Sequence, residues 1–419
     1  MIVSGLSGNE IFCLAKQGFS PGEIVVGNSV CSLGLVGGLG ALGRGLAGGE
    51  VENVTKLISE GRHAAIHRME EEAKKHGAQG VTGVGSDLRT MGGFMEFLAQ
   101  GTGVHGGPQG QPFFSCASSG MQIYCHLDAG YHPMRFAMGN VAYALGLGRG
   151  ISGSLRTLGR GEVTEFSQMY NHIRHLALER LRAEALAVGA NAVVDIQTRI
   201  LPYGAAIELL MTGTAAWNPT LGKPTKADEV RTSELTGEEL WNLADLGLVP
   251  VQLVMATSVY SLGVVGGIGS ALKGMARGEI PELTSLVYGA RENCLGLLAQ
   301  EAQRVGGEQV VGNRLNIREL SPGLIEVMAI GTAVRREQGL KPKTPQLIPQ
   351  AIIVDRTSED LDALQRADPT QMATTAMNLR RVGRGANNAV GLIVALMVMA
   401  FMALGVCGSI LAAIIGGSR

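Results

Sequence analysis

The chain has 419 residues, enough for two to four domains, so internal repetition is the first property to test. Its formal net charge is −1 and its isoelectric point is about 6.7, which excludes the global positive field of a nucleic-acid-binding protein. Glycine is abundant, with 61 residues, and aromatic residues make up only 4%. Compact packing must therefore come from close backbone approach and aliphatic contacts, and we expect no nucleic-acid partner.

One pattern occurs three times along the chain: a Leu-Gly pair, a glycine-rich stretch, a Gly-Glu pair that opens a long helical pattern, and a closing glycine. Gly49-Glu50 recurs 112 positions later at Gly161-Glu162 (161 − 49) and 229 positions later at Gly278-Glu279 (278 − 49), without gaps. We predict repeats over 1–104, 119–216 and 236–334, linkers over 105–118 and 217–235, a connector over 335–388, and a transmembrane helix over 389–415.

Each repeat begins with a short predicted helix whose two ends are both marked. A hydroxyl and a carboxylate or amide three residues later form capping boxes: Ser7 with Glu10, Ser119 with Gln122, and Thr236 with Glu239. Glycines suited to a left-handed C-cap follow, each three residues before a proline: Gly18, Gly130 and Gly247. These signals place three equivalent helices at the start of three equivalent units.

The rest of each repeat predicts a strand, a glycine loop, a long amphipathic helix and a hairpin. In the first copy the strand covers 23–30, the helix runs from 51 to about 76, and the hairpin strands cover 81–90 and 94–104. The fold class is therefore α+β, with three tandem β-α-β-β repeats. A three-stranded sheet with one face covered leaves its other face and its edges in need of a neighbour, which predicts side-by-side assembly.

The C-terminal region contains a long uncharged segment. Residues 389–415 are 27 mostly apolar positions without a charged side chain, enough to cross a bilayer with some tilt. Arg380, Arg381 and Arg384 precede the segment, so the positive-inside rule places the repeats on the cytoplasmic side. The N-terminus lacks the features of a signal peptide. We expect a single-pass, tail-anchored protein of a bacterial-type cell membrane with the lipid bilayer as a partner; a buried core helix is the alternative.

Each unit resembles the YbjQ-type heavy-metal-binding domain family. The resemblance depends on the strand ending in Gly27-Asn28, the glycine loop, the long helix closing at Gly77-Ala78, and a terminal Gly-Thr motif that recurs at Gly101-Thr102, Gly213-Thr214 and Gly331-Thr332. It implies a β-α-β-β unit that assembles into a pentameric, propeller-like ring. Three tandem copies then imply stacked rings, or another closed homo-oligomer built from pentamers or their multiples. The family name also implies a divalent heavy metal as a cofactor.

Histidines on the long helices are the candidate metal ligands. His63 and His67 are four residues apart and share a helix face, and His172 and His175 do the same three residues apart. A metal site needs three or four converging ligands, and Glu71 or a neighbouring subunit could complete one. The alternative is a solvated helix face.

Two columns of charged residues also recur. Basic residues precede the Gly-Glu carboxylates by six positions: Arg44 with Glu50, Arg156 with Glu162, and Lys273 with Glu279. Carboxylates stand in the middle of the last strand of each repeat, where burial is costly unless they are paired: Glu96, Glu208 and Glu326. One interpretation places them in ion pairs that fix assembly register; the other places them on the wall of a pore.

The sequence shows no catalytic constellation: there is no nucleophile elbow, no H-E-x-x-H and no P-loop. We therefore predict a protein that is not an enzyme. The leading hypothesis is a membrane-anchored homo-oligomeric scaffold in the form of a ring, tube or cage. A heavy-metal-binding or metal-sensing membrane protein is the alternative, and a pore or transport-related assembly is a further one.

Overall fold

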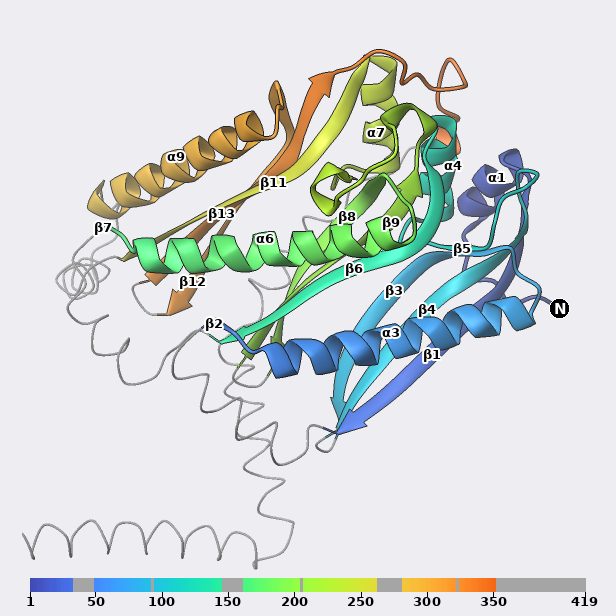
Figure 1. The fold of residues 1–419 in the computed structure, drawn as a ribbon, viewed down its shortest axis with the longest axis horizontal. Helices are drawn as coiled ribbons and strands as arrows, with labels where there is room; N and C mark the ends of the chain where they lie inside the picture. The colour runs from blue at the N-terminus through green and yellow to red at the C-terminus, as the bar shows by residue number, and fades with distance from the viewer. Residues whose placement is uncertain are drawn as a thin grey trace, which may run out of the picture. The chain divides into compact units, whose positions relative to one another are not determined.

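The computed structural model describes residues 1–32, 49–91, 94–144, 161–203, 206–261, 281–321 and 324–351 (Figure 1). All of them belong to one compact unit, Met1–Asp355. Several predicted features lie outside the described residues: the glycine loops with Arg44, Arg156, Lys273 and Glu279, the connector beyond Ala351, and the segment 389–415.

Each repeat starts with the short helix that the capping signals predict. The three helices are α1 (Gly8–Lys16), α4 (Gly120–Asp128) and α7 (Gly237–Asp245). In all three, the capping box is formed in both directions, from side chain to backbone and back. The closing glycines have positive φ angles, 82° at Gly18, 85° at Gly130 and 70° at Gly247. The predicted helix boundaries are confirmed, because local chemistry at each end sets them.

Three long strands form the sheet of each repeat, in the same order each time. The first sheet contains β1 (Phe19–Ser32), β4 (Phe94–Gly106) and β3 (Gly80–Met91), with β4 in the centre. The second contains β6 (His132–Ala144), β9 (Ala206–Trp217) and β8 (Ala192–Tyr203). The third contains β11 (Leu248–Ser261), β13 (Leu324–Arg336) and β12 (Gln309–Ser321). All of these neighbours are antiparallel.

One long helix follows the first strand of each repeat. These are α3 (Glu52–Lys75), α6 (Thr164–Ala187) and α9 (Pro281–Arg304). The buried stripe of α3 includes Val54, Ile58, Ala65, Met69 and Ala73, at the helical spacing that the sequence predicts. Mixed α+β repeats are thus confirmed, whereas no propeller is visible in the described part of this single chain.

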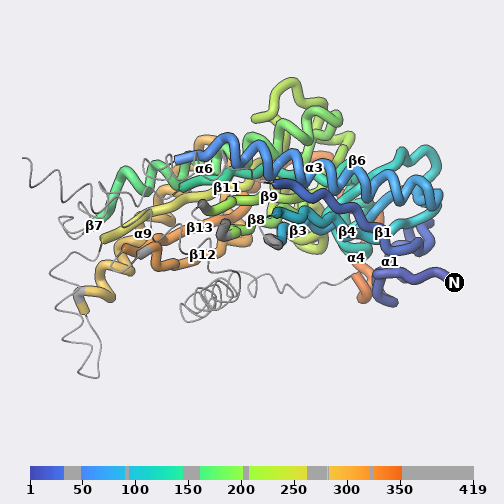
Figure 2. Tube along the Cα trace, turned by 90° about the horizontal axis from the view of Figure 1, so that it is seen from below, coloured from blue at the N-terminus to red at the C-terminus, as the bar shows by residue number. Residues whose placement is uncertain are grey.

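Two of the long helices, α3 and α6, lie between sheets of neighbouring repeats. Helix α3 packs on β1 and β4 of its own repeat and also contacts β6 of the second repeat, while α6 packs on β6 and contacts β11 of the third. Figure 2 shows α3 and α6 along one side of the strands. The hydrophobic core of the first repeat therefore includes Phe136 and Met138 of the second, and that of the second includes Leu253 and Met255 of the third.

Short segments extend each sheet across the repeat boundary. β2 (Gly49–Glu50) pairs with the end of β6, and β7 (Gly161–Glu162) pairs with the end of β11. At the opposite edges, β5 (Phe114–Ser115) runs parallel to the start of β3, and β10 (Arg231–Thr232) runs parallel to the start of β8. Consecutive repeats therefore exchange strands in both directions. Three single-turn helices complete the described elements: η1 (Pro219–Leu221), η2 (Ala227–Glu229) and η3 (Pro349–Ala351).

The membrane prediction needs correction. In the part of the chain that the structure describes, no helix is long and apolar enough to cross a bilayer. The long helices α3, α6 and α9 all include charged side chains, so a bilayer would have to bury ionised groups. For the described residues, the predicted localisation, tail-anchored in a bacterial-type membrane, is wrong. The predicted span 389–415 lies outside them.

Candidate functional site: the joints between repeats

The first and second repeats meet at an interface that we call the first joint. Arg62 of α3 forms its central contact. Its Nε lies 3.1 Å from Oε1 of Glu208 on β9, and its Nη2 lies 2.8 Å from Oε2. Its Nη1 donates to the backbone and hydroxyl oxygens of Ser86, each at 3.0 Å. Both charged side chains are 0% exposed. Such a pair fixes how two surfaces meet, because any other arrangement leaves a buried charge unpaired.

The second joint, between the second and third repeats, contains the same pair. Arg174 of α6 lies 2.5 Å from Glu326 of β13 and also donates to the Thr257 hydroxyl. Arg318 of β12 contacts the other oxygen of Glu326 at 2.6 Å. Burial raises the pKa of Glu326, but the two guanidinium groups outweigh it and hold that pKa below its usual value. Glu326 is therefore ionised at neutral pH, and the second joint contains a true ion pair.

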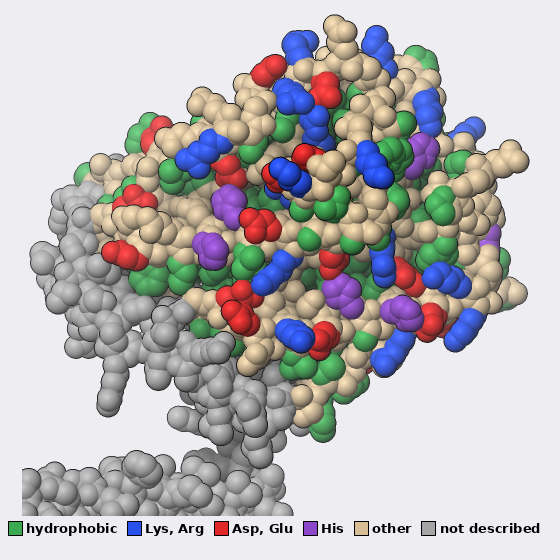
Figure 3. Space-filling model, in the orientation of Figure 1, with side chains coloured by type: hydrophobic (Ala, Val, Ile, Leu, Met, Phe, Trp, Pro, Cys, Tyr) green, Lys and Arg blue, Asp and Glu red, His purple; other side chains and the backbone are tan. Residues whose placement is uncertain are grey.

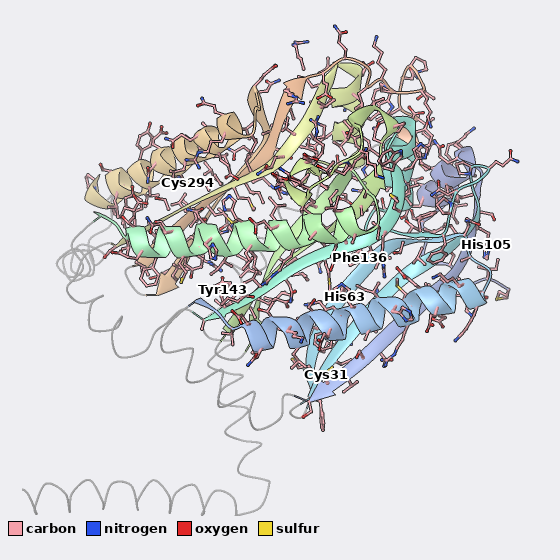
Figure 4. All side chains as sticks on the ribbon, in the orientation of Figure 1. Cys31, His63, His105, Phe136, Tyr143 and Cys294 are labelled. Carbon is pink, nitrogen blue, oxygen red and sulfur yellow. The ribbon has the colours of Figure 1, made fainter. Side chains whose placement is uncertain are left out.

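A histidine next to each arginine makes a second contact across the same joints. His63 Nε2 lies 2.6 Å from Glu184 Oε1, and His175 Nε2 lies 2.9 Å from Glu301 Oε1. Figure 4 shows His63 on the side of α3 that faces α6, and Figure 3 shows histidines beside acidic groups over both helices. The hydrogen bonds to Glu184 and Glu301 raise the pKa of the two histidines, although burial opposes the change. The histidines therefore strengthen both joints when protonated.

The Gly-Glu carboxylates also contact the following repeat. Glu50 of β2 pairs with Arg180 of α6, with Oε1 2.8 Å from Nη1 and Oε2 3.2 Å from Nη2. Glu162 of β7 accepts hydrogen bonds from the Ser258 hydroxyl at 2.9 Å and from Asn293 at 3.2 Å. Their predicted basic partners lie outside the described residues, so these contacts are additional to that hypothesis. The third mid-strand carboxylate, Glu96, is half-buried at the outer face of the first sheet.

The described histidines do not fit a heavy-metal centre. Both ring nitrogens of His63 are engaged, Nε2 with Glu184 and Nδ1 with the Ser59 backbone oxygen at 2.7 Å. His67 lies 3.7 Å from Glu71 on the exposed face of α3, and His172 is exposed. Within the described ranges, no three His, Cys, Asp or Glu side chains converge as metal ligands. Since a metal site needs three or four donors, the described side chains do not form one within a single chain.

A buried polar cluster in the second repeat resembles a catalytic set in composition only. Ser118 Oγ lies 3.4 Å from His126 Nδ1 and 2.8 Å from Thr214 Oγ1, while Asp195 Oδ1 accepts from Gln122 at 3.0 Å. Ser118 is 0% exposed, and burial lowers the pKa of His126 to about 3. A serine nucleophile needs access to substrate and a histidine able to take its proton, and this cluster offers neither.

Comparison with known families identifies the repeated unit. A family model described as "Putative heavy-metal-binding" matches residues 20–106, 131–218 and 249–337, which together are more than half of the chain. The chain belongs to the YbjQ family. The tandem YbjQ repeats predicted from the sequence motifs are thus confirmed, and each matched segment contains one three-stranded sheet and its long helix.

Curated relatives of the YbjQ repeats include one long protein and several short ones. An encapsulin nanocompartment protein of Mycobacterium tuberculosis is 32% identical over 228 residues, covering 51% of this chain and 84% of that protein. A UPF0145 protein of Methanoregula boonei is 38% identical over 82 residues, covering 17% of this chain and 68% of that protein. One of Burkholderia mallei is 36% identical over 77 residues, covering 18% and 69%. None of these names denotes an enzyme.

The arginines that pair with the mid-strand carboxylates are not among the residues predicted from the sequence. Arg62 recurs in ungapped register at Arg174 (174 − 62 = 112) and at Arg291 (291 − 62 = 229). This register is the same as that of the Gly-Glu pairs, so the arginine column could have been found by the same search. The sequence does not indicate that Arg62 and Arg174 are buried, because a charged residue on a long helix is usually exposed to solvent.

Proposed function

We propose that the protein is a non-enzymatic scaffold subunit that assembles with copies of itself into a closed ring, tube or cage. The observation that carries this proposal is the repetition of one joint within the chain, with an arginine–glutamate pair, a histidine–glutamate pair and an exchanged strand each time. In each joint, the helix side of one repeat meets the outer sheet face of the next. Contacts of this head-to-tail kind build rings when the rotation closes and filaments when it does not.

The relatives support a closed form of this assembly. The M. tuberculosis relative is named as a nanocompartment protein, which favours a cage among the forms that head-to-tail repeats can build. The family resemblance favours propeller-like rings with five repeats or a multiple of five. The metal-binding alternative loses support, because His63 and His175, one histidine of each candidate pair, are engaged in the joints.

The experiment that tests this function is a mass measurement on the purified full-length chain. Mass photometry at nanomolar concentration and native mass spectrometry at micromolar concentration are expected to show particles of several copies. Negative-stain images should show rotational symmetry and give its order. A chain that stays monomeric over this whole range would overturn the proposal.

A further inference from the structure

In the part of the chain that the structure describes, the first and third repeats each keep one joint surface uncovered, whereas the second repeat is covered on both sides. Among the described residues, the exposed large hydrophobic side chains all belong to the first and third repeats. Those of the first are Met1, Ile2, Val3, Phe12, Ile24, Val26, Val30 and Phe94, and those of the third are Leu246, Tyr288 and Leu315. Figure 3 shows hydrophobic side chains at the rim beyond α3, where β1 ends. Apolar side chains exposed to solvent at each end of the chain indicate a surface that binds a partner.

The uncovered surface of the first repeat is the outer face of β1. Its side chains Ile24, Val26 and Val30 are 44%, 44% and 57% exposed. The equivalent positions of the other repeats are covered by the preceding helix and are at most 3% exposed: Phe136, Met138 and Ala142 on β6, and Leu253, Met255 and Val259 on β11. In Figure 4, Cys31 of β1 and Tyr143 of β6 mark equivalent strand ends. Among the three described sheets, only the first lacks a helix on this face.

The uncovered surface of the third repeat is the outer side of α9. Arg291 is exposed, although Arg62 and Arg174 in the same register are 0% and 2% exposed in their joints. Its expected partner by the same register is Glu96, which faces outward from β4 at the other end of the chain. Within the described residues, neither side chain has an ion-pair partner. The two halves of one buried pair thus stand at opposite ends of the chain.

The backbone edges of the sheets are also complementary between the two ends of the chain. Ile2 and Val3 hold the positions of β5 (114 − 112 = 2) and β10 (231 − 229 = 2), which pair with the starts of β3 and β8. The corresponding edge in the third repeat is the start of β12, at Gln309 and Val310. Ile2 and Val3 are 57% and 67% exposed. This backbone observation is independent of the side chains on α9 and β1.

We infer that a second copy of this chain docks head-to-tail through a third joint: α9 and the edge of β12 of one copy cover the outer face of β1 and receive Ile2–Val3 of the next. This inference rests on the proposed function and names the surfaces that carry it. Arg291 of one copy pairs with Glu96 of the other, as Arg62 pairs with Glu208. Tyr288 reaches the position that Asn171 occupies in the second joint, where Asn171 bonds to the Thr257 backbone.

One position makes the third joint weaker than the two inside the chain. Glu292 stands in the register of His63 and His175 (292 − 63 = 229). Its expected neighbour, Glu72, is equivalent to Glu184 and Glu301 and accepts a hydrogen bond from the Val26 backbone at 2.6 Å. Two carboxylates therefore meet where the internal joints have a histidine–glutamate bond, and like charges at short distance repel. Copies of the chain should therefore separate from one another before the repeats within one chain separate.

Charge reversal tests the third joint with full-length chains. Arg291→Glu places a carboxylate opposite Glu96, and Glu96→Arg places a guanidinium group opposite Arg291, so each variant alone is expected to lose at least ten-fold in association. The double variant restores opposite charges at every joint, and a mixture of the two single variants restores them wherever the two reversed side chains meet. Arg304→Glu, an exposed reversal at the end of α9, is the matched control. Circular dichroism checks that each variant is folded, and Ile24→Glu provides a second way to block the same face.

The outcomes separate the inference from the function on which it rests. Loss of assembly in each single variant, with recovery in the double variant, supports the third joint. Assembly of the folded Arg291→Glu, Glu96→Arg and Ile24→Glu variants at wild-type strength overturns the third joint but leaves the scaffold function standing. A wild-type chain that is monomeric overturns the scaffold function itself.

Discussion

Asp195 occupies a backbone position that glycine holds in the other two repeats. Its φ angle is 54°, and Gly83 and Gly312 in the same register have φ angles of 64°. The side chain is buried, its Oδ2 has no hydrogen-bond partner among the described residues, and burial raises the pKa of Asp195 to about 7. A left-handed aspartate with an unsatisfied buried oxygen costs stability, so at this residue the second repeat departs from the pattern that its neighbours follow.

Replacing Asp195 with glycine should stabilise the protein, and more so at high pH. The pKa of the unfolded carboxyl is about 4, so between about pH 4 and pH 7 the folded state holds a proton that the unfolded state has lost. Stability therefore falls as pH rises through this window. We expect Asp195→Gly to raise the free energy of unfolding by about 1–3 kcal/mol at about pH 8 and by less at about pH 5.

Thermal unfolding at the two pH values measures this difference. Asp195→Asn is the matched control, because it keeps the left-handed position occupied by a side chain and removes only the charge. It should stabilise the protein at about pH 8 and have little effect at about pH 5. An Asp195→Gly protein that is less stable than wild type at about pH 8 would show that the carboxylate serves the fold.

At the scale of elements, the approach of the long helix to the first strand differs between repeats. A Cβ atom on Gly27 would lie 2.0 Å from the Ala65 backbone oxygen of α3, and one on Gly139 would lie 2.0 Å from the Ala177 backbone oxygen of α6. In the third repeat the same position is Ala256, which is 3% exposed. The first two helices therefore pack against strand backbone, and α9 accommodates one additional methyl group.

Adding that methyl group to the first two repeats should destabilise them. Gly27→Ala and Gly139→Ala force the helix away from its strand, and we expect each to cost about 1–3 kcal/mol or more, as overpacked cores do. Differential scanning calorimetry of the full chain measures the loss. Gly85→Ala is the control, since a Cβ there meets nothing within 4 Å. Equal stability of Gly139→Ala and Gly85→Ala would contradict the close packing of α6.

At the scale of the whole molecule, three similar repeats are joined by two joints and present the two halves of a third. The internal joints combine a buried ion pair with a histidine–glutamate bond, and the third replaces that bond with Glu292 opposite Glu72. An assembly with unequal joints should come apart at its weakest contact first. The chain, rather than the single repeat, is then the unit that dissociates.

Glu292→His should strengthen the assembly by giving the third joint the contact of the other two. A pair of this exposure is worth about 0.5–1 kcal/mol, so dissociation of copies should require more urea while unfolding of the chain changes little. Mass photometry follows dissociation and circular dichroism follows unfolding in the same urea series. Glu60→His, on the exposed side of α3, is the matched control. If both variants shift dissociation equally, Glu292 does not face the joint.

Local signals were sufficient for the elements and for their repetition. The capping boxes at Ser7, Ser119 and Thr236 and the apolar stripe of α3 depend on residues close together in the chain, so their prediction needed no tertiary knowledge. The Gly-Glu register likewise located the repeats. The pairing of Glu208 with Arg62 was not predictable in this way, because it joins residues 146 positions apart on different repeats.

The order of the repeats and the secondary structure of each repeat could thus be predicted from the sequence alone, because helix caps, periodicity and register are local properties. The contacts between repeats were decided only by the tertiary structure. The packing places α3 and α6 each between two sheets and buries Arg62 and Arg174 in the joints. It also bonds His63 and His175 to glutamates of the next repeat. Such contacts depend on the direction in which one repeat stacks on the next, which no local pattern specifies.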